Sequence, residues 1–312
     1  MHSNDTYDLT IIIPFYNTIN YINDTLISIN QQFIPKNIFI QVLVINDGSS
    51  QDISTHLKTI NHPNISITLH TKPNGNWGSV VNYVKQHKLA LGKYITILDS
   101  DDALDKKCLT HFFNVTANIG ADIVLGNFAY WNGKNRCKKI KTILNIRSKK
   151  WNISTKNINK FKTPYLMPLG KFYARQIFYQ IKNLSEHTYY QDVNLYYQSL
   201  FLAKNIYFIN KNLALYRSNR KDSSSNMNWS EKKLNNWINT ITFINNHDNA
   251  IGGIFYLLVK GFKNAYTLKY SQPLKIKGKI KVTYLPKIFY VPIWIFIKII
   301  LFSYRRVLIL AK

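Results

Sequence analysis

The stretch of residues 93–102 places the strongest constraint on how this chain folds. Residues 94–98 are mostly apolar and β-branched, and they predict a buried strand. Three carboxylates follow, at Asp99, Asp101 and Asp102, and because like charges repel they favour a divalent cation with oxygen ligands. Such a strand end points into the crevice where open α/β sheets bind ligands. The alternative interpretation is a solvated acidic turn in which one Asp begins the next helix.

Strand and helix patterns alternate through the first part of the chain. Besides the strand before Asp99, buried strands are predicted at 9–14, 38–45, 65–70 and 122–128. Helices are predicted between them, including 79–91 and 105–118. This alternation predicts an α/β domain with a mostly parallel sheet flanked by helices. Later segments predict a basic excursion at 134–150, a return to the sheet at 165–173, a helix within 184–202 and a strand at 206–216.

Charge is divided very unevenly along the chain. The formal net charge of the 312 residues is +26. Residues 1–130 carry 8 Lys, no Arg and 10 acids, a net of −2, whereas residues 131–312 carry 33 basic residues and 5 acids, a net of +28. A surface this positive attracts phosphates, anionic lipid or nucleic acid. With 46% hydrophobic and 18% charged residues, we expect a sizeable core.

The C-terminal part predicts a helical, basic extension with a membrane-associating tail. We expect a catalytic domain at 1–222 and an extension at 223–312, in which 284–312 is the tail. The apolar run at 288–304 is short for a spanning helix and contains a proline and a lysine, so a helix lying on an anionic membrane surface fits it better. A helix that packs on the catalytic domain is the alternative.

Two further features bear on location. The N-terminus is polar and has no apolar signal core, so we expect no secretion signal. Cys108 and Cys137 have neither metal nor redox spacing, which suggests a reducing compartment. We therefore expect a cytoplasmic protein that is peripheral at the inner face of the cell membrane.

Four motifs, in order, resemble family 2 glycosyltransferases. Residues 12–17, Ile-Ile-Pro-Phe-Tyr-Asn, resemble the family's opening strand, and residues 44–49 resemble the end of its second strand, usually Asp-Asp-Gly-Ser. Residues 93–102 resemble its strand with the Asp-X-Asp motif, and residues 190–192, Tyr-Gln-Asp, lie where the family usually has Glu-Asp. One Asp-X-Asp motif is a weak signal, but four ordered motifs over about the first 220 residues are a strong one.

The resemblance implies a GT-A fold, a nucleotide-sugar donor that is usually a UDP-sugar, a divalent metal, Mn²⁺ or Mg²⁺, and inversion at the anomeric carbon. It also implies a cell-surface acceptor, such as a saccharide, a lipid-linked glycan or a wall polymer of the teichoic-acid type. We therefore expect a hexosyl- or N-acetylhexosaminyltransferase and no nucleic-acid partner.

The resemblance also assigns roles to single residues. Asp192 is the general base that takes the acceptor's proton, or alternatively a surface Asp favoured by the helix dipole. Asp101 is the metal ligand, and Asp47 accepts a hydrogen bond from uracil or, alternatively, caps a helix. Contacts with the donor nucleotide are assigned to Pro14, Tyr16, Asp47, Asn82, Asp99 and Ser100. Weaker candidates for substrate or diphosphate contacts are Asp102, Trp77, Lys171, Gln191 and Arg217.

Three positions depart from the family pattern. Asn46 replaces the first Asp of the second motif, and Gln191 replaces the usual Glu. Val81 precedes Asn82 where many members have Arg, so a contact with phosphate or ribose is absent or comes from another basic residue. None of the three departures removes a carboxylate that the expected chemistry needs.

A hypothesis of another class is a non-catalytic basic protein that binds anionic polymer or nucleic acid on a degenerate GT-A fold. The net charge of +28 in residues 131–312 favours it. The sequence has no zinc spacing and no aromatic RNA-binding signature, which argues against it. The joint presence of Asp47, Asp99, Asp101 and Asp192 favours the enzyme, and the lack of a P-loop or GxGxxG motif argues against NTP hydrolysis and NAD chemistry.

Overall fold

The computed structural model describes residues 7–117, 119–140, 148–153, 168–218 and 220, together with short runs between 230 and 240. The chain divides into two compact units, Met1–Met227 and Asn228–Lys312. The sheet and the helices around it belong to the first unit. The predicted membrane-associating tail lies outside the described residues.

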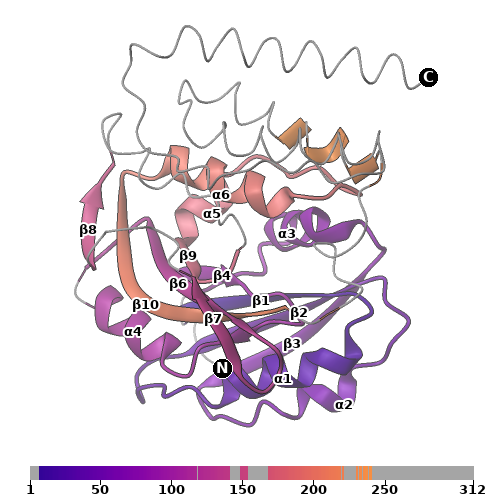
Figure 1. Cartoon of the computed structure of the whole chain (residues 1–312), viewed down its shortest axis with the longest axis horizontal. Helices are drawn as coiled ribbons and strands as arrows, with labels where there is room; N and C mark the ends of the chain where they lie inside the picture. The colour runs from indigo at the N-terminus through magenta and orange to yellow at the C-terminus, as the bar shows by residue number, and fades with distance from the viewer. Residues whose placement is uncertain are drawn as a thin grey trace, which may run out of the picture. The chain divides into compact units, whose positions relative to one another are not determined.

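One mixed sheet of ten strands forms the centre of the first unit (Figure 1). In chain order the strands are β1 (Leu9–Phe15), β2 (Ile40–Asp47), β3 (Ile65–Lys72), β4 (Tyr94–Ile97), β5 (Ala103–Leu104), β6 (Ile123–Trp131), β7 (Arg136–Ile140), β8 (Lys149–Asn152), β9 (Lys171–Ala174) and β10 (Asn205–Arg217). The order across the sheet is β3-β2-β1-β4-β9-β6-β10-β5, with β7 paired to β6 and β8 to β10.

The sheet has a parallel half and a mixed half. In the run β3-β2-β1-β4 each strand is parallel to the next, and β6 and β10 are parallel to each other. The short strand β9 lies between β4 and β6 and is antiparallel to both. The basic excursion contributes β7, which is antiparallel to β6, and β8, which is antiparallel to β10. The sheet therefore has more antiparallel pairing than the sequence predicts.

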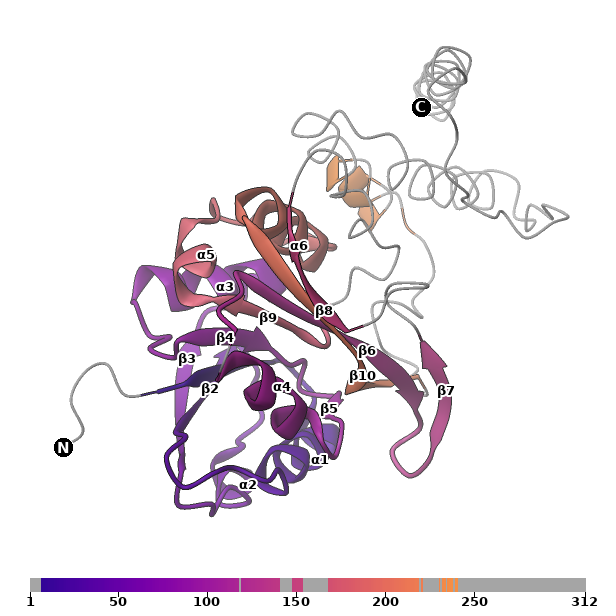
Figure 2. The same ribbon diagram turned by 90° about the vertical axis from the view of Figure 1, so that its left-hand side faces the viewer.

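Helices cover both faces of the sheet (Figures 1 and 2). They are α1 (Ile19–Asn30), α2 (Ser54–Leu57), α3 (Asn76–Gln86), α4 (Cys108–Thr116), α5 (Arg175–Gln180) and α6 (Gln191–Leu202). Helices α1, α2 and α4 lie on one face, whereas α3, α5 and α6 lie on the other. The predicted α/β class, with helices flanking the sheet, is confirmed.

The main core lies between β1 and the helices beneath it. Every second residue of β1, from Leu9 to Phe15, is fully buried in this core. Ile22, Leu26 and Ile29 of α1 join them, because their spacing of four and three residues puts them on one helix face. Each such side chain contributes about 1.5–3 kcal/mol through removal from water. This packing fixes β1 at the centre of the parallel half.

Two predicted helices have different bounds in the structure. The helix expected at 79–91 starts earlier, at Asn76, and ends at Gln86, so Trp77 lies in its first turn and not in a loop. The helix expected at 105–118 begins only at Cys108, since the backbone N–H of Asp105 still donates to a carbonyl of β10. Because of this pairing, α4 starts after the edge strand β5 and later in the chain than predicted.

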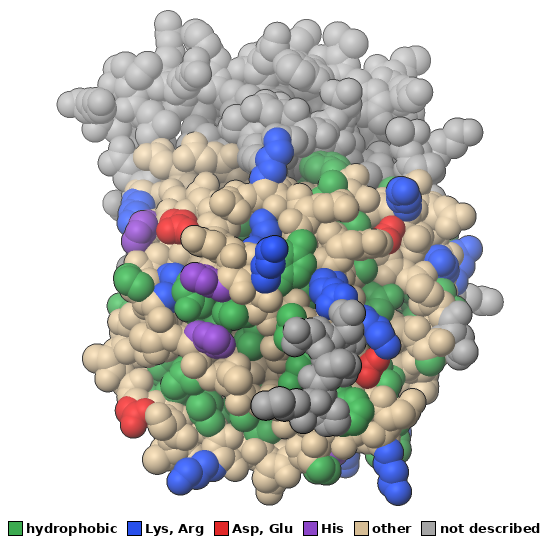
Figure 3. Space-filling model, turned by 180° about the vertical axis from the view of Figure 1, so that it is seen from behind, with side chains coloured by type: hydrophobic (Ala, Val, Ile, Leu, Met, Phe, Trp, Pro, Cys, Tyr) green, Lys and Arg blue, Asp and Glu red, His purple; other side chains and the backbone are tan. Residues whose placement is uncertain are grey.

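The surface of the first unit carries both signs of charge. On the face drawn in Figure 3, Lys and Arg side chains are interspersed with Asp and Glu among many uncharged polar groups. In the part of the chain that the structure describes, no helix is both long enough and apolar enough to cross a bilayer.

Candidate active site

The predicted acidic stretch lies where the parallel strands end. Strand β1 lies between β2 and β4 in parallel register, so the carboxyl ends of the three strands lie side by side. There the N–H of Leu98 donates to the carbonyl of Ile12, and residues 99–102, here called the acidic loop, leave the sheet. The buried hydroxyl groups of Ser100 and Thr18 are 2.7 Å apart. This hydrogen bond ties the acidic loop to the start of α1.

Asp47, at the end of β2, is buried and accepts several hydrogen bonds. Its Oδ1 lies 2.6 Å from Lys72 Nζ, 3.0 Å from the Gly75 N–H and 3.3 Å from the Ser79 hydroxyl. Its Oδ2 lies 3.2 Å from the side-chain amide of Asn74. Lys72 reaches Asp47 because β2 and β3 are parallel and place the two residues in register. Asp47 therefore holds the loop between β3 and α3 against the end of β2.

The carboxylates of the acidic loop have different partners. The indole N–H of Trp77 donates to Asp99 Oδ1 at 2.9 Å, and Arg220 Nη1 lies 3.0 Å from Asp101 Oδ2. Burial, followed by the nearby charge of Asp101, raises the pKa of Asp99 to about 7. Burial, followed by the charges of Asp101 and Asp99, also raises the pKa of Asp102 well above its usual value. The loop is thus a concentration of negative charge that a cation would stabilise.

Arg217, the last residue of β10, anchors the acidic loop. Its backbone N–H donates to Asp102 Oδ1 at 2.8 Å, and its Nε donates to the carbonyl of Asp101 at 2.7 Å. Its Nη2 pairs with Asp24 Oδ2 of α1 at 2.6 Å, and its guanidinium lies 4.4 Å from the Trp131 ring. The Arg217 side chain, 5% exposed, is therefore held by protein groups on several sides.

Asp192 lies in the first turn of α6, across from the acidic loop. Tyr190, just before this helix, has a left-handed backbone with φ +65°. The Asp192 charge adds to the burial that raises the pKa of Tyr173, and it opposes the burial that lowers the pKa of Lys171. It also contributes to the raised pKa of Asp99. Trp77 of α3 donates to Asp99 at 2.9 Å, and a Cβ added to Gly78 would lie 3.1 Å from Gln191 Cγ, so the first turn of α3 lies against both the acidic loop and the start of α6.

Gln191 and Asn82 shape the loop between α5 and α6. The side-chain oxygen of Gln191 accepts a hydrogen bond from the Ser185 N–H at 3.0 Å. The amide of Asn82 both donates to and accepts from the backbone of Leu184, at 2.9 Å each, and it donates to Glu186 at 3.0 Å. Both side chains therefore hold the segment that leads into α6 and Asp192.

Three further candidates differ in how accessible they are. Tyr16 follows β1 and is 48% exposed, so its ring is available to a ligand. Pro14, within β1, is half-buried. Lys171, at the start of β9, is only 2% exposed. Its side chain is therefore much less accessible to a ligand than the ring of Tyr16.

A metal ion would have to be held mainly by Asp101. Among the residues that the structure describes, no group of three or more His, Cys, Asp or Glu has metal-binding geometry. Mg²⁺ and Mn²⁺, however, bind few protein carboxylates and complete their coordination with phosphate oxygens and water. The guanidinium of Arg220 already places a positive charge beside Asp101. A cation at the acidic loop would therefore share Asp101 with Arg220 and take its other ligands from phosphate and water.

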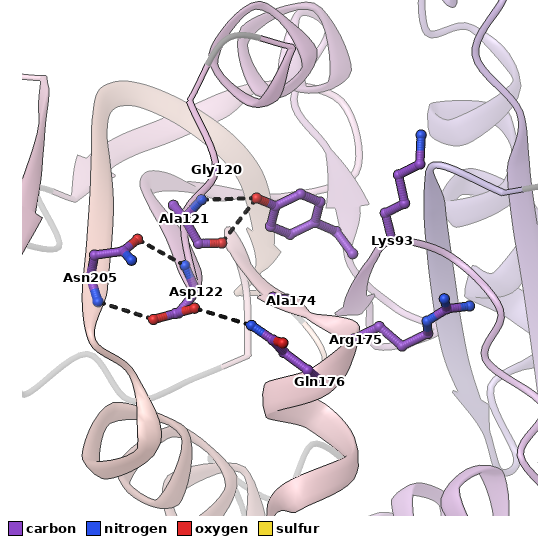
Figure 4. Close-up of a pocket in the computed structure, with 9 residues that line it drawn as sticks. Lys93, Gly120, Ala121, Asp122, Ala174, Arg175, Gln176 and Asn205 are labelled. Carbon is purple, nitrogen blue, oxygen red and sulfur yellow. Dashed lines mark hydrogen bonds between the residues drawn. The ribbon is translucent and has the colours of Figure 1, made fainter. Parts of the chain in front are cut away.

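A surface pocket of about 540 Å³ lies at the opposite ends of the strands from the acidic loop (Figure 4). It adjoins the amino ends of β4, β6 and β10, where Asp122 accepts a hydrogen bond from the Asn205 N–H at 3.1 Å. The Tyr94 hydroxyl donates to the Ala121 carbonyl at 2.9 Å. These polar groups bond to one another, and no residue of the acidic loop or of α6 lines this pocket.

The structure reveals contacts that the sequence analysis does not predict. Lys72 pairs with Asp47, and Arg220 pairs with Asp101. The first had a signal in the sequence, since Lys72 follows the third predicted strand as Asp47 follows the second. The second had none, because Asp101 and Arg220 are far apart in the chain and no pattern connects them.

The fold, with an acidic loop at the carboxyl ends of its parallel strands, is that of a class, the glycosyltransferases of the GT-A fold. The family model "Glycosyl transferase family 2" matches residues 10–182. An uncharacterised glycosyltransferase of Mycoplasma genitalium is 33% identical over 289 residues, which cover 90% of this chain and 91% of the relative. The chain belongs to glycosyl transferase family 2, and it is a glycosyltransferase.

Two more distant relatives carry more specific names. The poly(ribitol-phosphate) beta-glucosyltransferase of Bacillus spizizenii is 30% identical over 129 residues, which cover 40% of this chain and 20% of the relative. The crystal structure of S. aureus TarS residues 1–349 with UDP-GlcNAc is similar in fold, with a TM-score of 0.63 and 20% identity. The match covers 88% of this chain and 77% of the 1–349 chain of TarS. The predicted GT-A fold is confirmed.

Proposed function

We propose that this glycosyltransferase is an inverting enzyme that transfers a sugar from a UDP-sugar to a hydroxyl of a cell-surface polysaccharide, a glycolipid or a teichoic-acid-type polymer. One observation carries the proposal. The first turn of α3 joins the acidic loop to the start of α6, because Trp77 donates to Asp99 Oδ1 at 2.9 Å and a Cβ added to the next residue, Gly78, would lie 3.1 Å from Cγ of Gln191, the neighbour of Asp192. A single displacement at an anomeric carbon needs a base for the acceptor hydroxyl and positive charge for the departing diphosphate, and Asp192 and a cation at the acidic loop would supply them.

Asp192 acts as the general base in the proposed reaction. It accepts the proton of the acceptor hydroxyl while that oxygen forms a bond to the anomeric carbon. The bond from this carbon to the diphosphate breaks on the opposite face, and UDP leaves with the bonding electrons, so the configuration inverts. Asp101 would hold Mn²⁺ or Mg²⁺, which offsets the charge on the departing diphosphate. Asp192 then releases its proton to water.

The donor nucleotide binds at the ends of β1 and β2 in this proposal. Tyr16 is 48% exposed there and offers its ring to the uracil base. Asp47 accepts the N–H of uracil in addition to the hydrogen bonds that hold the loop after β3. Asp99 and Ser100 lie on the acidic loop, within reach of the ribose. The similarity in fold to TarS with UDP-GlcNAc supports a UDP-sugar donor.

The acceptor is the finer part of the proposal. The Bacillus spizizenii relative is named for action on poly(ribitol-phosphate), and this name supports an anionic wall-type acceptor for the present enzyme. The net charge of +28 in residues 131–312 suits such a polymer as well. The same charge would suit the second candidate function, a non-catalytic protein that binds anionic polymer or nucleic acid.

Calorimetry with UDP and a panel of UDP-sugars, in Mn²⁺ or in EDTA, tests the proposal. We expect one UDP-sugar to bind in Mn²⁺ and to bind at least tenfold more weakly in EDTA, because the cation bridges the protein and the diphosphate. CDP serves as the matched nucleotide control and should bind more weakly than UDP. A folded protein that binds no UDP under either condition would contradict the proposal and favour the second candidate function.

We also propose that the enzyme is peripheral at the inner face of the cell membrane. The apolar run at 288–304 lies between basic segments, and each basic residue near an anionic leaflet contributes about 1 kcal/mol. Deletion of residues 284–312 should release the protein from sedimenting vesicles of anionic lipid and leave UDP binding unchanged. Sedimentation that is the same with and without the deletion would contradict this location.

A further inference from the structure

Lys72, the last residue of β3, directs its ammonium group into the protein. The side chain is 11% exposed, and Nζ lies 2.6 Å from Asp47 Oδ1 and 2.7 Å from the Ser79 hydroxyl. A third hydrogen bond goes to the carbonyl of Pro73. An ammonium group has three N–H donors, so these contacts use all of them. Lys72 is therefore not available to bind a phosphate, and its effect on a ligand must pass through Asp47.

The two oxygens of the Asp47 carboxylate have very different surroundings. Oδ1 is contacted by Lys72, by the Gly75 N–H at 3.0 Å and by the Ser79 hydroxyl at 3.3 Å. Among the described residues, the side-chain amide of Asn74, at 3.2 Å, is the one donor to Oδ2. A carboxylate has about four acceptor sites, two on each oxygen. Oδ1 is thus committed to the protein, whereas Oδ2 can accept another hydrogen bond.

The exposed Asn74 side chain marks the side from which a ligand reaches Oδ2. Its amide nitrogen also donates to the backbone carbonyl of Asp47 at 2.9 Å, so the bond to Oδ2 is the longer and weaker of the two. The ring N–H of uracil is an imide donor, similar in kind to the Asn74 amide. Oδ2 therefore already accepts, from the protein, the type of hydrogen bond that uracil would supply.

We propose that Lys72 is a positioning residue that sets the base specificity of the donor site: its ammonium group fixes Oδ1 of Asp47, so that Oδ2 accepts the ring N–H of uracil. Lys72 itself does not contact the nucleotide. This inference rests on the proposed function, in which Asp47 recognises uracil. Cytosine has a lone pair at that ring nitrogen and an amino donor beside it. A carboxylate that is held at Oδ1 cannot turn toward the amino group, so cytosine is rejected.

The test is calorimetry of UDP and CDP with the variant Lys72→Met, which keeps most of the side-chain length and removes the charge. Without its cationic partner the Asp47 carboxylate is no longer fixed, and UDP binding should weaken by about tenfold. CDP should lose much less, so the ratio of the CDP to the UDP dissociation constant should fall at least about fivefold. The difference between Mn²⁺ and EDTA should persist, because the acidic loop has other partners.

Lys93→Met is the matched control, because it removes a lysine from another ion pair. Lys93 pairs with Asp8 at 2.8 Å and precedes β4, so its replacement should leave both dissociation constants near their wild-type values. An equal loss of UDP and CDP binding in Lys72→Met would show a purely structural role. An unchanged ratio would show that Lys72 does not act on base recognition. Either result overturns the proposal.

Lys72→Gln keeps a side-chain N–H donor without the charge and provides a second test if Lys72→Met does not fold. It should shift the ratio of the two dissociation constants in the same direction, by about threefold. An unchanged ratio in the folded Gln variant overturns the proposal. A wild type that binds UDP and CDP equally contradicts the proposed UDP-sugar donor. A preference for UDP that survives in the Lys72 variants contradicts this inference alone.

Discussion

The variant Asp192→Asn lowers kcat for sugar transfer by about 10²–10⁴-fold, the usual contribution of a general base. Asn has the same shape as Asp but cannot accept the proton of the acceptor hydroxyl. The nucleotide binds at the ends of β1 and β2 and at the acidic loop, so the dissociation constant for UDP should change less than threefold. The measurement is UDP release with saturating donor and acceptor, together with calorimetry of UDP binding.

Glu186→Gln is the matched control for this variant. Glu186 is the other acidic residue in the segment around α6. In the structure Glu186 is exposed and accepts a hydrogen bond from Asn82 at 3.0 Å, which the Gln side chain can preserve. Its kcat should stay within threefold of the wild type. If Glu186→Gln loses activity and Asp192→Asn keeps it, the roles of the two residues must be exchanged.

The strand pattern and the acidic motif are predictable from local sequence. An apolar, β-branched run followed by Asp99 leads to a buried strand that ends at a crevice, because burial and charge act on adjacent residues. The alternation of strands and helices likewise predicts which strand ends share an edge. These patterns therefore predict that Asp47 and the acidic loop lie at neighbouring strand ends.

The supports of the site come from distant segments and leave no local pattern. Arg217 connects to Asp24 and Asp102, which are 193 and 115 residues away in the chain. Strand β9 has four residues, too few for a period to identify it, and its antiparallel pairing on both sides places Lys171 beneath α6. Sequence reasoning therefore finds the carboxylates and names Lys171 and Arg217 as candidates, but it does not predict which groups these two cations contact.

The variant Asp101→Asn should abolish the effect of Mn²⁺ on UDP binding and lower kcat by at least about 100-fold. A Lewis-acid cation contributes several kcal/mol to transition-state stabilisation, and each 1.4 kcal/mol is a factor of ten in rate. An Asn side chain binds a hard divalent cation more weakly than a carboxylate does. Calorimetry of UDP in Mn²⁺ and in EDTA should therefore give the wild-type difference only when Asp101 is present.

Asp8→Asn provides the same chemical change at the other end of β1. Asp8 pairs with Lys93 at 2.8 Å, precedes the strand and lies away from the acidic loop, so its replacement should leave the Mn²⁺ effect intact. In Asp101→Asn the guanidinium of Arg220 also loses its carboxylate partner. If Arg220 alone supplied the positive charge for the diphosphate, UDP would bind Asp101→Asn equally well in Mn²⁺ and EDTA and at wild-type strength. If Asp101→Asn binds UDP more weakly than the wild type in Mn²⁺, but the two proteins bind UDP equally in EDTA, the positive charge comes from a cation held by Asp101.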